Sequence, residues 1–256
     1  MIVLVVIAVL LALILYFVCP RIRSRAKPFY GVFFHRGRFG GDIKENTAGA
    51  FAAAVDAGYG FEFDVRLSAD GKTYISHDDS LKRVFGVDKK LSETSSAELS
   101  EIGVPSLEET LSIAGGKVPL IVEIKGEDKN MEVCKAACDI LMGYSGPFCV
   151  ESFNPFYMKY VRRNYPEIIR GQLSHHFGKQ AKPSLTVGCF FLTNLFADFM
   201  SRPDFIAYDW TRHGNFFLNL CGVLGAVKVG WSPCGNKQIE EAKKYFDTVI
   251  VEDYDI

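Results

Sequence analysis

The sequence carries almost no net charge. Its 29 Lys and Arg residues stand against 30 Asp and Glu residues, which gives a formal net charge of -1 and a pI near 6.5. Domains that bind nucleic acid usually show a basic stripe or a high pI. We therefore expect no nucleic-acid partner.

The sequence also lacks a cysteine framework, internal repeats and low-complexity segments. Its seven cysteines are an odd number without a Cys-x-x-Cys pair, and 256 residues can bury a core without disulfides. Cys134 and Cys138 would share a helix face, but no further ligand follows at the spacing of a metal site. We expect reduced, buried thiols.

One long apolar run is present, at residues 2–18, and contains no charged side chain. As a helix it would rise roughly 25 Å, close to the thickness of a bilayer core. No basic residue precedes the run and no small-residue cleavage site follows it, so a cleaved signal peptide is disfavoured. The run predicts an uncleaved, single-pass transmembrane helix.

A basic cluster follows this run. By the positive-inside rule it places the remainder of the chain on the cytoplasmic side of a membrane. We expect a membrane anchor and basic juxtamembrane linker at residues 1–27 and one catalytic domain at residues 28–256, and we leave the oligomeric state open. The cluster consists of Arg21, Arg23, Arg25 and Lys27.

From residue 28 onward, short apolar segments alternate with helical segments, a rhythm typical of α/β folds with a parallel sheet. Eight such units predict a (β/α)₈ TIM barrel. Asp70-Gly71 is a strong turn signal, and the few residues between 65 and 73 are too short for a parallel crossover, so 73–77 is expected to form an extra β-hairpin after the second strand. The expected barrel strands are 30–34, 60–65, 120–125, 147–152, 169–173, 205–209, 226–231 and 248–252.

Three features of the segments around these strands can also be predicted. Asn46 or Thr47, Ser95 and Ser106 stand where helix N-caps are expected. Residues 188–200 are rich in phenylalanine and are interpreted as a barrel helix, with a membrane-facing wedge as the alternative. No helix follows the last strand before residue 256, so we expect something else to cover that flank.

The candidate site lies where strands of such a barrel end. Alternation in 60–65 puts Glu62 and Asp64 on one face of their strand, and Glu123 and Lys125 share a face at the next. His35 ends the first strand, and the hairpin should return His77 toward these acids. Glu151, at another strand end, is a candidate for a supporting position. We expect His175, His176 and His213 to be loop residues.

This set of residue types points to phosphate chemistry. Three carboxylates, Glu62, Asp64 and Glu123, form an oxygen site suited to Mg²⁺ or Ca²⁺. Arg36 and Lys125 could neutralise a phosphate together with the metal. His35 and His77 could then act as general base and acid, which describes a metal-assisted phosphodiesterase.

These residues also lie in motifs that resemble the glycerophosphodiester phosphodiesterase family. The motifs are HRG at 35–37, ENT at 45–47, EFDV at 62–65, DG with HDD at 70–79, PSLEE at 105–109, VEIK at 122–125 and ESFNP at 151–155. The resemblance implies a TIM barrel of the kind shared with phosphatidylinositol-specific phospholipases C, a divalent metal on Glu62, Asp64 and Glu123, and catalytic His35 and His77.

The resemblance further implies a reaction and a substrate pocket. Glycerophosphodiesters would be hydrolysed to sn-glycerol 3-phosphate and an alcohol, with the neighbouring glycerol hydroxyl as a candidate first nucleophile. Arg36 and Lys125 would bind the phosphate, and Trp231 would line the pocket. Two alternatives stay open: a lysophospholipase D acting on lysophospholipids at a membrane, favoured by 2–18 and 188–200, and a catalytically idle barrel that binds headgroups.

Overall fold

The computed structural model describes residues 1–21, 26, 29–126, 131–177 and 186–255. Eight parallel strands form a closed barrel, because β1 pairs with both β9 and β2, while β3 pairs antiparallel with β2. The predicted TIM barrel with an extra hairpin after the second strand is thus confirmed. The strands are β1 (Gly31–Phe34), β2 (Gly60–Leu67), β3 (Thr73–Ile75), β4 (Leu120–Ile124), β5 (Phe148–Ser152), β6 (Arg170–Ser174), β7 (Phe205–Asp209), β8 (Val227–Cys234) and β9 (Thr248–Glu252).

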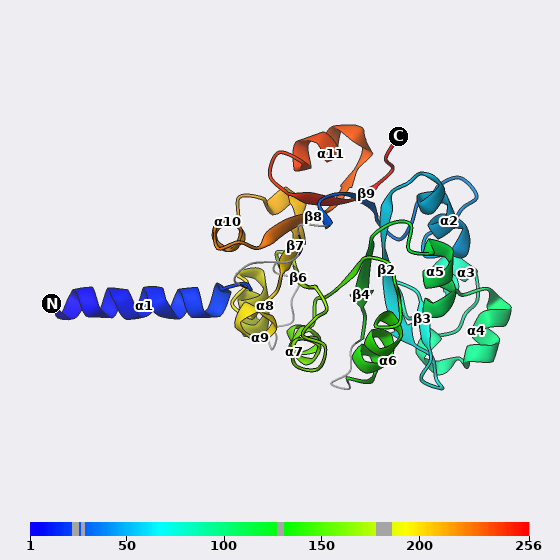
Figure 1. The fold of residues 1–256 in the computed structure, drawn as a ribbon, viewed down its shortest axis with the longest axis horizontal. Helices are drawn as coiled ribbons and strands as arrows, with labels where there is room; N and C mark the ends of the chain where they lie inside the picture. The colour runs from blue at the N-terminus through cyan, green and yellow to red at the C-terminus, as the bar shows by residue number, and fades with distance from the viewer. Residues whose placement is uncertain (22–25, 27–28, 127–130, 178–185, 256) are drawn as a thin grey trace.

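Helices surround the strands on the outside of the barrel (Figure 1). Thr47, Ser95 and Ser106 are N-caps, as the sequence predicts, and each side chain accepts a hydrogen bond from a backbone N–H of the first turn. The helices are α1 (Ile2–Val18), α2 (Ala48–Asp56), α3 (Lys82–Phe85), α4 (Ser96–Ile102), α5 (Leu107–Ala114), α6 (Glu132–Leu141), α7 (Pro155–Asn164), α8 (Thr186–Thr193), α9 (Asp198–Ser201), α10 (Phe216–Val223) and α11 (Gly235–Ala242).

Alternation along the strands separates two apolar layers. Phe61, Phe63 and Val65 of β2 pack outward in the large core between strands and helices. Phe33, Ile121 and other side chains fill the smaller core, which we interpret as the barrel interior. In β2 and in β4, the polar residues alternate with these outward-facing side chains. They therefore point into the barrel.

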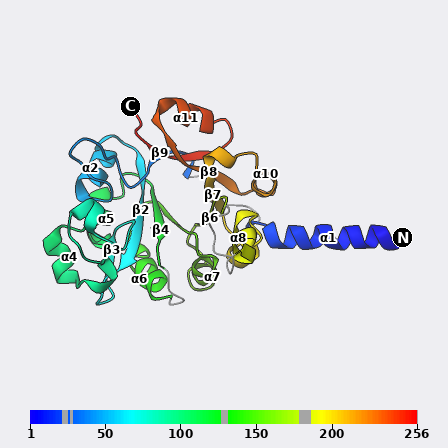
Figure 2. The same cartoon turned by 180° about the vertical axis from the view of Figure 1, so that it is seen from behind.

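Helix α1 extends away from the barrel and touches it at its C-terminal end, beside α8 and α9 (Figures 1 and 2). Its 17 residues are apolar. Within the described residues, no helix combines the length and the apolar character needed to cross a bilayer, so the structure does not support the transmembrane helix predicted at 2–18. Placement of the catalytic domain on the cytoplasmic side stays a prediction.

The aromatic segment predicted as one barrel helix is broken into α8 and α9. Leu195 between them has a left-handed φ of 60°, which ends the first helix. Phe190 is 56% exposed, whereas the ring of Phe17 from α1 packs edge to face on Phe199 at 5.2 Å. The segment therefore joins α1 to the barrel and keeps part of its aromatic surface exposed.

The flank after the last strand is covered by an aromatic side chain. The ring of Tyr254, which follows β9, lies 6.0 Å from the ring of Tyr59 and 6.4 Å from that of Phe34. These contacts cover apolar surface beside β1. They lie on the flank after β9, for which the sequence predicts no helix.

Gly60 begins the strand that carries two acids of the candidate site, and it has no room for a side chain. A Cβ there would lie 2.6 Å from the ring of Phe33 and 2.6 Å from the carbonyl oxygen of Pro119. We expect Gly60→Ala to lower the free energy of unfolding by about 1–3 kcal/mol, because the packed ring and backbone around the new methyl group would have to move. Urea unfolding followed by circular dichroism measures this loss.

Gly49→Ala is the matched control. In helix α2 the nearest atom to a new Cβ lies 3.7 Å away, so this change should stabilise the protein by roughly 0.5–1 kcal/mol. Equal effects of the two changes would contradict the close packing at Gly60.

Candidate active site

A small cavity of about 220 Å³ lies at the carboxyl ends of the strands. It gathers side chains from β2, β4, β5, β6, β8 and β9 and from residues that follow β1, β3, β4, β5 and β6. Asp64 is buried beside it, in contact with Lys125 and Arg36. The structure thus brings together every site residue predicted from the sequence. The cavity is lined by His35, Arg36, Glu62, His77, Glu123, Lys125, Glu151, Phe153, Leu173, His175, Trp231 and Ile250.

The register of the parallel strands sets the carboxylates side by side. Asp64 of β2 pairs with Glu123 of β4, which pairs with Glu151 of β5. Glu62, Asp64 and Glu123 each offer an oxygen within 4.8 Å of the others, and all three are buried. Within the described residues, Glu62 Oε1 has no hydrogen-bond partner. This geometry could hold a metal ion.

The clustered acids perturb one another. Burial, reinforced by neighbouring carboxylates, raises the pKa of Glu62 well above its usual range. Burial, opposed by Lys125 and reinforced by Asp64, raises the pKa of Glu123 to about 7. Burial acts in the same direction on Asp64, but Lys125 and Arg36 outweigh it and lower the pKa of that carboxyl. The two neighbouring cations, Lys125 and Arg36, do not neutralise the whole cluster of carboxylates. A bound divalent ion would reduce the repulsion that remains among them.

Two cations border the carboxylates. Lys125 Nζ lies 2.8 Å from Glu123 Oε1 and 3.1 Å from Asp64 Oδ1. The backbone N–H of Arg36 donates to Glu62 Oε2 at 3.1 Å. The guanidinium Nη1 of Arg36 donates to Glu45 Oε1 at 2.7 Å. Both positive groups are therefore fixed beside the place where an anion would enter.

Residues of the ENT motif support this arrangement from behind. Asn46 is buried, and its Nδ2 donates to Asp64 Oδ2 at 2.8 Å. Glu45 accepts from Arg36 and also from Arg83 Nη2 at 2.8 Å. Of the two N-cap candidates in this motif, Thr47 caps α2 and Asn46 instead orients an acid of the site.

His35 is oriented by Glu252, a residue that lies in none of the sequence motifs. Its Nδ1 lies 2.5 Å from Oε1 of Glu252, the last residue of β9, and its Nε2 lies 3.8 Å from Glu62 Oε2. The hydrogen bond from His35 lowers the pKa of Glu252. Glu252 stands at the end of the predicted strand 248–252. This position alone indicates a site residue, since polar residues at the carboxyl ends of barrel strands lie near the site.

His77 is held by its neighbours after the hairpin. Its Nδ1 lies 2.8 Å from Asp78 Oδ1, and Asp78 accepts from Arg83 Nε at 2.7 Å. Arg66 Nη2 donates to the carbonyl oxygen of His77 at 2.7 Å, which fixes the loop backbone. Burial lowers the pKa of His77, with Asp64 acting in the opposite direction. The imidazole is thus fixed through Nδ1, with its neutral form favoured.

One expectation about this cavity needs correction, and the structure also shows which way Glu151 faces. His175, expected to be a plain loop residue, lines the cavity, and its ring lies 6.2 Å from the Trp231 ring and 5.7 Å from the Phe153 ring. Glu151 faces inward and is buried, with its pKa raised by burial and by Glu123. The sequence missed His175 because its loop comes close to Trp231 only when the barrel closes.

Residues 35–216 match the model of the glycerophosphoryl diester phosphodiesterase family. Among curated proteins, an uncharacterized protein YqiK of Bacillus subtilis is 34% identical over 41% of the chain and 52% of its own length. A glycerophosphodiester phosphodiesterase of Bacillus altitudinis is 32% identical over 37% of the chain and 44% of its own length. The matches thus span about half of these curated relatives.

Solved structures resemble the whole barrel. A crystal structure of a glycerophosphodiester phosphodiesterase from Thermotoga maritima has a TM-score of 0.68 at 25% identity and covers 86% of this chain and 93% of that one. A phosphodiesterase from Oleispira antarctica, in complex with sn-glycerol-3-phosphate, has a TM-score of 0.69 at 22% identity and covers 88% and 94%. The similarity to the Oleispira antarctica structure shows that the two chains share a fold.

The crowded carboxylates predict an unusual pH dependence of stability without metal. Because the pKa of Glu123 rises from 4.5 to about 7 on folding, the folded protein keeps a proton that the unfolded chain releases. In chelator, we expect the free energy of unfolding to fall as pH rises from about 4.5 to about 7. Glu123→Gln should remove this contribution. Urea unfolding at a series of pH values measures it.

Glu108→Gln, at an exposed position of α5, is the control and should keep the wild-type pH dependence. A pH dependence of Glu123→Gln equal to that of the wild type would contradict the assignment to the buried cluster.

Proposed function

Because the chain belongs to the glycerophosphoryl diester phosphodiesterase family, we propose that it hydrolyses glycerophosphodiesters to sn-glycerol 3-phosphate and an alcohol. The observation that carries this proposal is the cavity that joins His35 and His77 to the three-carboxylate cluster and two cations. Each member alone is an ordinary strand-end residue, but together they supply acid, base and charge neutralisation at one point.

One divalent cation, Mg²⁺ or Ca²⁺, fits the three carboxylates Glu62, Asp64 and Glu123. All donors are hard oxygens, a set that favours these ions over zinc, and an oxygen of Glu62 is buried without a hydrogen-bond partner in the described chain. When bound, such an ion polarises a phosphoryl oxygen and offsets the negative charge of the cluster.

The remaining steps belong to the side chains of the cavity. Arg36 and Lys125 attract the phosphate and orient it. His77, whose lowered pKa favours the neutral imidazole, accepts the proton of the attacking hydroxyl. His35, hydrogen-bonded to Glu252, donates a proton to the departing alkoxide as its bond to phosphorus breaks. With the neighbouring glycerol hydroxyl as the attacking group, this step leaves a cyclic phosphate, which water opens to sn-glycerol 3-phosphate with the proton transfers of the two histidines reversed. Trp231 packs against Phe153 and His175, and this aromatic wall borders the cavity in which the substrate would lie.

The two-histidine assignment predicts that His35→Ala and His77→Ala each lower kcat for glycerophosphocholine by about 100-fold or more, because general acid–base catalysis contributes that much. Metal binding, measured by calorimetry, should remain in both variants. Glu62→Gln should instead weaken metal binding.

His213→Ala is the control, since the ring of His213 stacks on Tyr245 and does not line this cavity. Wild-type turnover by His77→Ala would contradict the mechanism. A folded, metal-loaded protein without turnover would favour the idle headgroup-binding barrel.

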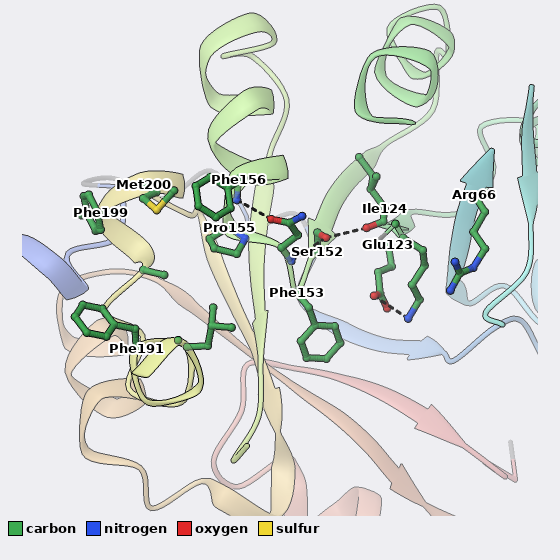
Figure 3. Close-up of a pocket in the computed structure, with 16 residues that line it drawn as sticks. Arg66, Glu123, Ile124, Ser152, Phe153, Pro155, Phe156, Phe191, Phe199 and Met200 are labelled. Atoms are coloured by element: carbon green, nitrogen blue, oxygen red, sulfur yellow. Dashed lines mark hydrogen bonds and ion pairs between the residues drawn. The ribbon is translucent and has the colours of Figure 1, made fainter. Parts of the chain in front are cut away.

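A second candidate function is lysophospholipase D activity, and a larger pocket beside the cavity favours it. This pocket of about 650 Å³ shares Glu123, Lys125 and Phe153 with the catalytic cavity. Figure 3 shows Phe156, Phe191, Phe199 and Met200 gathered at one end and Glu123 and Arg66 at the other. A lysophospholipid whose phosphate lies at Lys125 could place its acyl chain along this aromatic wall.

The acyl-chain assignment can be tested on Phe191, which lines the pocket and is 37% exposed. We expect Phe191→Ala to lower kcat/KM for lysophosphatidylcholine by about tenfold, because burial of an aromatic side chain against an acyl chain is lost. The value for glycerophosphocholine, which has no acyl chain, should be unchanged.

Phe216→Ala, at a 70% exposed position of α10, should change neither value. Equal losses on both substrates would contradict an acyl-chain pocket while leaving the glycerophosphodiester proposal standing.

A further inference from the structure

Four arginines from separate segments meet at the base of α1. They line a groove of about 700 Å³, which we call the arginine groove, together with Ala12, Leu15, Tyr16, Cys19, Pro20 and Pro166. Arg21 follows α1, Arg162 lies on α7, Arg170 begins β6 and Arg202 follows α9. The groove lies at the amino ends of the strands, opposite the catalytic cavity.

Backbone carbonyl groups position these side chains. Arg202 Nη1 donates to the carbonyl oxygens of Tyr16 and Cys19, both at 2.8 Å. Arg162 Nη1 donates to the carbonyl oxygens of Phe199 and Met200, both at 3.1 Å. Arg170 Nε donates to the carbonyl oxygen of Ser201 at 2.7 Å. The guanidinium groups of Arg162 and Arg202 are therefore held in place by neutral backbone groups.

In the described part of the chain, two carboxylates, Asp204 and Asp198, interact with arginines of this groove. Asp204 is buried and forms an ion pair with Arg21 at 3.7 Å. Within the described residues, neither Arg162 nor Arg202 forms an ion pair. Burial raises the pKa of Asp198 well above its usual range, against a smaller opposing effect of Arg202, which favours its neutral form. Arg162 and Arg202 therefore bring positive charge to the groove that no carboxylate of the described residues pairs with.

The opposite wall of the groove is apolar. Leu15 and Tyr16 of α1 are 43% and 55% exposed, and the other large side chains from Ile2 to Leu13 are exposed as well. Arg202 also lies over the ring of Tyr16, 5.0 Å from its centroid. A free anion would use only the cationic wall. An amphipathic ligand, with a phosphate beside hydrocarbon, would use both walls.

We propose that the arginine groove binds the phosphate of an anionic phospholipid, with the acyl chains of that lipid lying against Leu15 and Tyr16. Guanidinium groups bind phosphate oxygens through paired N–H donors. The apolar surface of α1 selects a lipid over a small anion. The lipid is a ligand of this groove and is separate from the substrate of the catalytic cavity.

The test uses the full chain in mild non-ionic detergent, with bound lipid counted by native mass spectrometry. Phosphatidylglycerol and phosphatidylcholine with the same acyl chains are the probes. The wild type should bind phosphatidylglycerol more tightly. Arg162→Gln should raise the Kd for phosphatidylglycerol about fivefold, the effect of one basic residue near anionic lipid, and leave that for phosphatidylcholine unchanged.

Arg163→Gln is the matched control. It removes the same charge from the next residue of α7, which is exposed and outside the groove. It should leave both values unchanged, and thermal unfolding should show that both variants are folded. Equal affinity of the wild type for the two lipids, or equal effects of the two variants, would overturn the proposal. Inorganic phosphate that binds as tightly as phosphatidylglycerol, with the same dependence on Arg162, would overturn it in favour of a small-anion site.

Discussion

The structure depends on a concentration of buried negative charge. Register pairs Asp64, Glu123 and Glu151 across three adjacent strands, with Glu62 one inward position below Asp64. Such proximity is unfavourable for ionised carboxylates in a protein interior. Lys125 and Arg36 offset part of it, and the raised pKa values of Glu62 and Glu123 show that the compensation is incomplete. Bound protons or a divalent ion would relieve the repulsion that remains.

The surroundings of the cluster follow from this constraint. Glu45, Asn46 and the backbone N–H of Arg36 hold the acids and the guanidinium in place. Each histidine is fixed through Nδ1 by a carboxylate, Glu252 for His35 and Asp78 for His77. Nε2 of each ring is not used in these contacts, and this is the arrangement that the proposed acid–base roles of the two histidines require.

The molecule presents apolar surface near both ends of the strands. At the carboxyl ends, the aromatic pocket of α8 and α9 adjoins the catalytic cavity. At the amino ends, α1 forms one wall of the arginine groove. The rings of Phe17 and Phe199 link the two regions. A protein that meets lipid would use both surfaces together, with the substrate at one end and a second lipid at the other.

Local signals in the sequence determined much of this protein. Strand positions, the hairpin after β2 and the caps at Thr47, Ser95 and Ser106 follow from alternation and turn chemistry, which act over a few residues. The same alternation set Glu62 and Asp64 on one inward face.

Only the tertiary structure decided which distant residues complete the sites. Glu252 reaches His35, His175 reaches Trp231, and four arginines meet beside α1 because barrel closure brings together segments far apart in the chain. Hydrophobic pattern specifies which side of a strand is buried. It carries no information about which neighbour a polar side chain will face, and that choice depends on register and packing.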